Sequence, residues 1–222
     1  MIIKGILFDL DGTLANTLPL CIKVYKQAFE RYGGRPYTDD EVTAHFGLTE
    51  AGIFKRVVPE RWEEGLKYYY ELYESQHNEC SEPFAGIGKA LYLLQERGIR
   101  MAAVTGKGFY TAEYTLKYLG IAQYFSTIEA GQENAVAKEE AIRKILQSWQ
   151  MDPQYAAYIG DTDYDMKEAV AAGVLPLAAA WAETATIHLL DTIKPYATFT
   201  TVESFITWIE EHIVSAHVPV QE

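Results

Sequence analysis

Two aspartates near the start of the chain stand two residues apart, directly after an apolar run. Asp9 and Asp11 follow Ile2–Phe8, and Gly12 and Thr13 complete the motif DLDGT. On a strand their side chains can point to the same side, where two carboxylates repel each other unless a cation lies between them or one is protonated. Glycine permits a tight turn and close approach of the backbone to a ligand. The motif therefore indicates a cation or acid-base site, with solvated acids at a strand-to-loop turn as the alternative.

A second acidic motif, GDTDYD, follows another apolar run. Asp161 comes directly after Tyr155–Ile159 and Gly160, so it repeats the arrangement of Asp9. Asp165 lies on the first turn of a predicted helix, where the helix dipole favours a carboxylate and gives it a purely structural alternative. Hard oxygen ligands from two strand ends suit an octahedral Mg²⁺ that keeps waters and a substrate phosphate oxygen.

Polar and basic residues complete the candidate chemistry. Thr105 and Gly106 follow Ile99–Val104, where a hydroxyl and a glycine amide can hold a phosphoryl oxygen, although Thr-Gly after a strand is also ordinary turn chemistry. Lys107 is expected to be solvated. Lys138 begins a predicted helix, and because a helix N-terminus disfavours cations, we expect an anion near it. An exposed lysine paired with neighbouring glutamates is the alternative.

The elements that must position these residues alternate between strands and helices, which is typical of a parallel α/β sheet. Between Pro19 and about Glu82 the alternation stops and only helical signals appear, with Thr38 and Glu41 forming a predicted capping box. An insertion directly after the first strand would lie above the carboxyl ends of the sheet, where open parallel sheets bind ligands. The predicted strands are Ile2–Phe8, Ile99–Val104, Phe125–Glu129, Tyr155–Ile159, Leu175–Ala179 and Ala197–Thr200, and the predicted helices outside the insertion are Gly88–Arg97, Tyr110–Leu119, Lys138–Trp149, Asp163–Ala172, Thr184–Leu190 and Val202–Val214.

Composition limits the possible partners. The formal net charge is -12, from 19 Lys and Arg against 31 Asp and Glu, which argues against a nucleic-acid or anionic-membrane partner. A phosphate site in such a chain needs a cation or fixed backbone dipoles. Cys21 and Cys80 are too few for a disulfide framework, and no window has the ~20 apolar residues of a membrane span. The two cysteines are expected to be reduced thiols of a cytoplasmic protein, and the sequence leaves open whether it is a monomer or a homodimer.

The motifs DLDGTLANT, AVTGK, Lys138 and GDTDYD, in this order, resemble the four motifs of the haloacid dehalogenase superfamily. The match covers Ile2 to about Ala180, and the helical insertion is similar to that of the phosphoglycolate phosphatase and beta-phosphoglucomutase branch. One departure is that Glu139 and Glu140 follow the lysine where many relatives have proline. The resemblance implies a doubly wound, Rossmann-like, mainly parallel α/β core of residues 1–16 and 83–216, a helical cap domain of residues 17–82, and a tail of residues 217–222.

The resemblance also implies a function. The expected activity is that of a Mg²⁺-dependent phosphatase that hydrolyses a small phosphorylated metabolite, such as a phosphoglycolate-like monoester, through an aspartyl-phosphate intermediate. Asp9 would be the nucleophile and Asp11 the general acid and base. The expected site residues are catalytic Asp9, Asp11, Thr105 and Lys138, phosphate-binding Thr105, Gly106 and Lys138, and metal-binding Asp9, Asp11, Asp161 and Asp165.

Several alternatives remain open on the sequence. A phosphomutase shares every motif and differs only in the acceptor, and a catalytically silent phosphate-binding protein would bind without turnover. A dehalogenase needs neither the second acid nor the metal site. A signalling receiver domain combines similar residues, but it has no helical insertion and its acceptor is not in the first strand.

Overall fold

A six-stranded sheet forms the centre of the molecule in the computed structural model, which describes residues 2–133, 138–185 and 193–213. The strand order is β3-β2-β1-β4-β5-β6, and every strand pairing among the described residues is parallel. The order reverses at β1, which lies between β2 and β4, so the carboxyl end of β1 is the switch point at which such sheets bind ligands. The strands are β1 (Gly5–Phe8), β2 (Arg100–Val104), β3 (Ile128–Glu129), β4 (Ala156–Gly160), β5 (Leu175–Ala179) and β6 (Ala197–Phe199).

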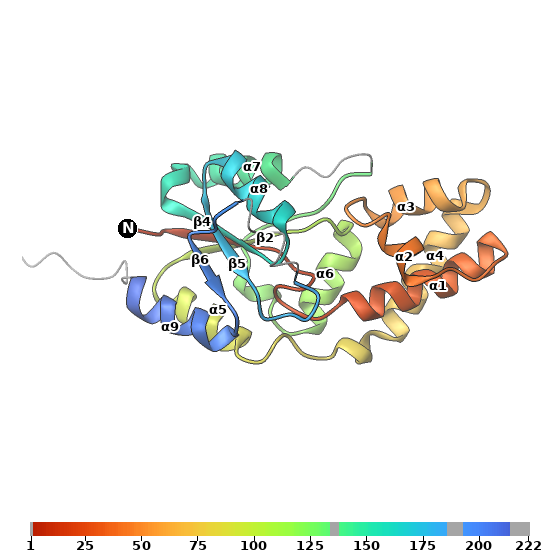
Figure 1. Ribbon diagram of the computed structural model, residues 1–222, viewed down its shortest axis with the longest axis horizontal. Coiled ribbons are helices and arrows are strands. Elements are labelled where there is room, and N and C mark those ends of the chain that lie inside the picture. The colour runs from red at the N-terminus through yellow and green to blue at the C-terminus, as the bar shows by residue number, and fades with distance from the viewer. Residues whose placement is uncertain (1, 134–137, 186–192, 214–222) are drawn as a thin grey trace, which may run out of the picture.

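Helices cover both faces of this sheet (Figure 1). Side chains alternate along β1, so Leu7 is buried in one apolar cluster with Ile145, while Phe8 belongs to the other and packs edge-on against Phe205. This two-sided burial explains why the strands are continuous apolar runs. One face carries α7 (Lys138–Trp149) and α8 (Asp163–Ala172), and the other carries α5 (Ile87–Glu96), α6 (Phe109–Tyr118) and α9 (Val202–His212).

A second group of helices lies beyond the carboxyl ends of the strands (Figure 1). They enclose an aromatic core in which Tyr25 packs against Phe29, Phe54 and Tyr69. We propose that they form the cap domain predicted for residues 17–82, and the term cap is used for them below. The cap helices are α1 (Leu18–Gly33), α2 (Asp39–Thr43), α3 (Glu50–Val57) and α4 (Trp62–Ser75), with 3-10 turns at Pro59–Arg61 and His77–Cys80.

Most predicted elements are present, with differences at their ends. The bounds predicted for α7 and α8 match, and the capping box of Thr38 and Glu41 is confirmed. The strand predicted over Phe125–Glu129 is shorter, because the Phe125 amide is hydrogen-bonded back to Ala122 in a 3-10 turn. Residues 186–190 of the helix predicted at 184–190 lie outside the described residues. The last residue of the predicted final helix, position 214, and the predicted tail of residues 217–222 also lie outside them.

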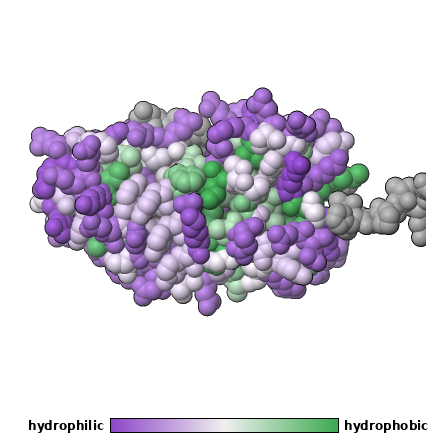
Figure 2. Space-filling view, turned by 180° about the vertical axis from the view of Figure 1, so that it is seen from behind, coloured by the Kyte–Doolittle hydropathy of each residue, from purple (hydrophilic) through white to green (hydrophobic). Residues whose placement is uncertain are grey.

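The molecular surface is largely polar on one side. Figure 2 shows hydrophilic side chains over most of the rear face, with hydrophobic ones gathered near its middle. Within the described part of the chain, no helix combines the length and the hydrophobicity that crossing a bilayer requires.

Candidate active site

The carboxyl ends of three neighbouring strands bring the predicted site residues together. Asp9 follows β1, Thr105 follows β2 and Asp161 follows β4. The parallel register aligns Phe8 with Ala103 on one side and with Ile159 on the other, so the residues that follow emerge at the same edge. The local sequence pattern of an apolar strand ending in a polar residue therefore produces one shared site.

Three buried carboxylates meet at this edge. Asp9, Asp161 and Asp165 each place an oxygen within 4.8 Å of the others. Burial is the main reason that the pKa of Asp9 is raised to about 7 and that of Asp161 to about 8. Among the described residues, the buried Oδ1 of Asp9 has no hydrogen-bond partner. Ionising these buried carboxylates is unfavourable unless a cation lies between them. Oxygen ligands of this kind therefore fit a divalent cation such as Mg²⁺.

Gly12 allows the first acidic motif to close over Asp161. Its φ is 78°, and a Cβ at this position would lie 2.2 Å from Asp161 Oδ2. The next residue, Thr13, donates a hydrogen bond from Oγ1 to Asp161 Oδ1 at 3.3 Å. Because any side chain at position 12 would collide with the carboxylate, glycine is needed for close approach as well as for the turn.

Lys138 lies between two of these carboxylates. Its Nζ is 3.1 Å from Asp9 Oδ1 and 2.6 Å from Asp165 Oδ1, which confirms the prediction of a nearby anion. Asp165 Oδ1 also accepts from Tyr158 Oη, and Asp165 Oδ2 accepts from the amide and the hydroxyl of Thr162. Burial alone would lower the pKa of Lys138, but Asp165 and Asp9 more than offset this and raise it. Burial alone would raise the pKa of Asp165, and Lys138 holds it below its usual range.

The prediction that Lys107 is solvated is wrong. Its side chain is buried, with Nζ 3.0 Å from Cys21 Sγ, 3.5 Å from Asp11 Oδ1 and 4.9 Å from the centre of the Tyr73 ring. Asp11 is less buried, and its Oδ1 accepts a hydrogen bond from Thr17. Burial alone would lower the pKa of Lys107, but Asp11 and its other neighbours raise it. The cap helices α1 and α4 cover this lysine, and local sequence could not indicate that contact.

One cavity connects these groups. It has a volume of about 460 Å³ and lies between the strand ends and the cap. All predicted site residues line it except Asp165, which lies behind Lys138. Lys107 and Glu50 also line the cavity and were missed, because both depend on how the cap is placed. The lining residues contributed by the cap are Leu18, Cys21, Tyr25, Phe46, Gly47, Leu48, Glu50, Ile53 and Tyr69.

Buried polar contacts hold the cap against the core. Glu50, at the start of α3, accepts hydrogen bonds from the Gly108 amide at 2.7 Å and from the Thr111 hydroxyl. The hydroxyl of Tyr73 on α4 is hydrogen-bonded to the hydroxyl of Thr115 on α6, with 2.8 Å between the two oxygens. Glu50 is buried, and it provides an acceptor for the backbone amide of Gly108, which lies directly before α6. The cap is therefore docked over the cavity in this structure.

A parallel α/β sheet with carboxylates and a lysine at its switch point, covered by helices, places the protein among α/β proteins that bind ligands at the carboxyl ends of their strands. The family model of the haloacid dehalogenase-like hydrolases matches residues 6–179. The chain belongs to this family, which confirms the resemblance, and it is a phosphatase of the family.

Known proteins support this assignment over most of the chain. Pyrophosphatase PpaX of Halalkalibacterium halodurans is 32% identical, and the match covers 78% of this chain and 82% of that protein. A haloacid dehalogenase-like family hydrolase from Streptococcus pneumoniae has a similar structure, with a TM-score of 0.75 and 26% identity over 93% of this chain and 98% of that one. A predicted phosphatase from Clostridium acetobutylicum, 21% identical, shares the fold with a TM-score of 0.76 over 95% of this chain and 100% of that one.

Proposed function

We propose that this phosphatase depends on Mg²⁺ and hydrolyses a small phosphoryl compound through a phosphorylated Asp9. One observation supports this most strongly. The buried Asp9 carboxylate borders a covered cavity, and its Oδ1 is ion-paired with Lys138 Nζ at 3.1 Å but accepts no hydrogen bond from the described residues. A carboxylate in this setting is a nucleophile that needs no base to activate it once it is ionised.

Asp9 and Asp161 are the residues that would hold the metal. Bound there, Mg²⁺ would offset the repulsion between carboxylate and phosphate and keep the carboxylates ionised. Asp165 contributes differently in this proposal. Both of its oxygens already accept two hydrogen bonds each, including one from Lys138, so we assign it to positioning the lysine. Asp11 has one oxygen engaged by Thr17 and is the proposed general acid and base.

The reaction has two steps. In the first, an Asp9 oxygen forms a bond to phosphorus, the bond from phosphorus to the leaving oxygen breaks, and Asp11 gives its proton to that oxygen. In the second, Asp11 takes a proton from water as the water oxygen attacks phosphorus, and the bond to Asp9 breaks to release phosphate. Lys138, the Thr105 hydroxyl and the Gly106 amide stabilise charge on the equatorial oxygens.

The substrate is proposed to be small. The cavity of about 460 Å³ is closed on one side by aromatic cap residues. The resemblance to the phosphoglycolate phosphatase branch suggests a phosphoglycolate-like ester, and the relatives named pyrophosphatase PpaX add pyrophosphate as a candidate. Both compounds fit the charge pattern of a site with two buried lysines.

Phosphate release from both compounds, with Mg²⁺ and with EDTA, tests the proposal. We expect turnover only with the metal, and we expect Asp9→Asn to lower kcat by about 10³-fold or more because the nucleophile is lost. Asp39→Asn, which removes an exposed cap carboxylate, is the matched control and should retain activity. Wild-type rates in Asp9→Asn, or full activity in EDTA, would contradict the mechanism.

A further inference from the structure

The ammonium group of Lys107 is buried without enough acceptors. A lysine ammonium has three N–H donors, and a buried charge is costly unless it is paired. Among the described residues, Nζ contacts the Cys21 sulfur, a weak acceptor, and Asp11 Oδ1 at 3.5 Å, and it lies 4.9 Å from the centre of the Tyr73 ring. A charge-assisted hydrogen bond is about 2.7 to 2.9 Å long, so the Asp11 contact is too long to satisfy this cation. Lys107 has donor capacity left for another anion.

The two buried lysines lie beside different carboxylates. Lys138 is 3.1 Å from Asp9, where phosphorus is transferred, whereas Lys107 is beside Asp11, the proposed acid. Since the acid must contact the leaving oxygen, a cation next to it lies on the leaving-group side of the site. Lys107 is therefore placed to contact the part of the substrate that departs.

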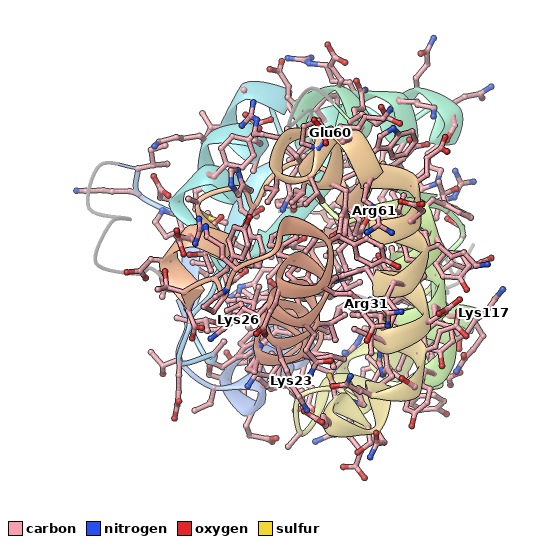
Figure 3. The ribbon with its side chains drawn as sticks, turned by 90° about the vertical axis from the view of Figure 1, so that its right-hand side faces the viewer. Lys23, Lys26, Arg31, Glu60, Arg61 and Lys117 are labelled. Atoms are coloured by element: carbon pink, nitrogen blue, oxygen red, sulfur yellow. The ribbon has the colours of Figure 1, made fainter. Side chains whose placement is uncertain are left out.

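The positive charges of the cap are directed away from the cavity. Lys107 and Lys138 are the only cationic side chains among the described residues that line the cavity. Figure 3 shows Lys23 and Lys26 extending from the outer side of α1, and each pairs with an exposed acid. The cavity wall near Lys107 is otherwise mostly apolar and aromatic, and the carboxylate of Glu50 is occupied by Gly108 and Thr111.

We propose that Lys107 binds a negative charge on the leaving group, so that the preferred substrates are phosphoryl compounds whose leaving group is itself an anion. A carboxylate, as in 2-phosphoglycolate, and a second phosphate, as in pyrophosphate, have this property. The proposal rests on the proposed function and extends it, because a phosphatase acting through Asp9 does not require such a preference. It also gives a role to a lysine that the mechanism leaves unused.

The test compares Lys107→Met with wild type on three compounds in the presence of Mg²⁺. Pyrophosphate and 2-phosphoglycolate carry an anionic leaving group, and 2-hydroxyethyl phosphate is a neutral analogue of similar size. We expect the variant to lose about 10- to 100-fold in kcat/KM on the anionic compounds. This loss should exceed the loss on the neutral ester by at least tenfold. Lys107→Arg should recover part of the preference, and Lys26→Met is the matched surface control.

Binding separates this proposal from the proposed function. Calorimetry measures the affinity of the same compounds for Asp9→Asn, with and without Lys107→Met, so the preference is measured even if wild type hydrolyses none of them. Thermal unfolding verifies that the variants are folded. An equal loss on the neutral and anionic compounds would mean that Lys107 acts through Asp11 or through stability, and it would overturn the proposal. Absence of binding of all three compounds would overturn the proposal as well. The anionic compound whose affinity falls more on Lys107→Met identifies the leaving group that Lys107 prefers.

Discussion

At the level of single residues, the site concentrates carboxyl groups where water is excluded. Asp9 and Asp161 are both buried, and burial raises their pKa values to about 7 and about 8. In the folded, metal-free protein these groups keep protons over a pH range in which unfolded aspartates, with a pKa of about 3.9, have lost them. Their contribution to stability is therefore present below about pH 4 and is lost as the pH rises through the folded values.

A consequence for the proposed metal site is that Mg²⁺ would have to displace protons in order to bind. We expect Mg²⁺ affinity to increase between pH 6 and pH 8, by about tenfold per pH unit for each displaced proton. Calorimetry in buffers of different ionisation enthalpy measures both the affinity and the protons released. Asp161→Asn should remove about half of this pH dependence, because Asp9 still loses a proton, and Asp39→Asn should leave it intact. An affinity independent of pH would show that the carboxylates are already ionised without the metal.

The proposed division of labour between Asp161 and Asp165 is also testable by substitution. Asp165 is hydrogen-bonded through both oxygens and holds Lys138, so Asp165→Asn should weaken Mg²⁺ binding by about tenfold. Asp161→Asn should weaken it by about 100-fold or more because a direct ligand is lost. Mg²⁺ titration of both variants compares them. If Asp165→Asn costs as much affinity as Asp161→Asn, both residues bind the metal, as the sequence suggested.

At the level of elements, the structure depends on how α3 meets α6. Glu50 is 2% exposed and accepts from the Gly108 amide and the Thr111 hydroxyl, which joins the cap to the core. Phe46, Gly47 and Leu48, which precede Glu50, line the cavity. Access of substrate to the cavity is therefore expected to depend on how the cap is docked. The helix predicted over Tyr110–Leu119 corresponds to α6, whereas α3 is not predicted as a separate helix and its contact with α6 depends on residues far apart in the chain.

Removing this contact should loosen the cap. Glu50→Ala leaves the buried Gly108 amide without its acceptor and takes the carboxylate away from the Thr111 hydroxyl, which keeps only the Gly108 carbonyl. We expect the free energy of unfolding to fall by about 1 to 3 kcal/mol. Equilibrium unfolding in urea measures the change, and Glu60→Ala, an exposed cap residue in Figure 3, is the control. A Glu50→Ala variant as stable as wild type would show that the buried hydrogen bonds contribute nothing to docking.

At the level of the whole molecule, a chain with a net charge of -12 handles an anionic substrate by local arrangement. The positive groups are two buried lysines and the proposed cation, all at the switch point of the sheet. Surface lysines such as Lys23 and Lys26 pair with exposed acids outside the cavity. Selection among phosphoryl compounds is therefore expected to depend on the cavity interior.

The sequence by itself determined the strands, most helices and the acidic motifs, because apolar periodicity and the residues at strand ends are local properties. It also indicated that Asp9 and Asp161 would converge, since parallel strands end at one edge. Only the tertiary structure decided that Lys107 is buried, that Asp165 is saturated by hydrogen bonds, and that Glu50 reaches α6. These features depend on contacts between residues far apart in the chain, and the placement of the cap over the core creates several of them.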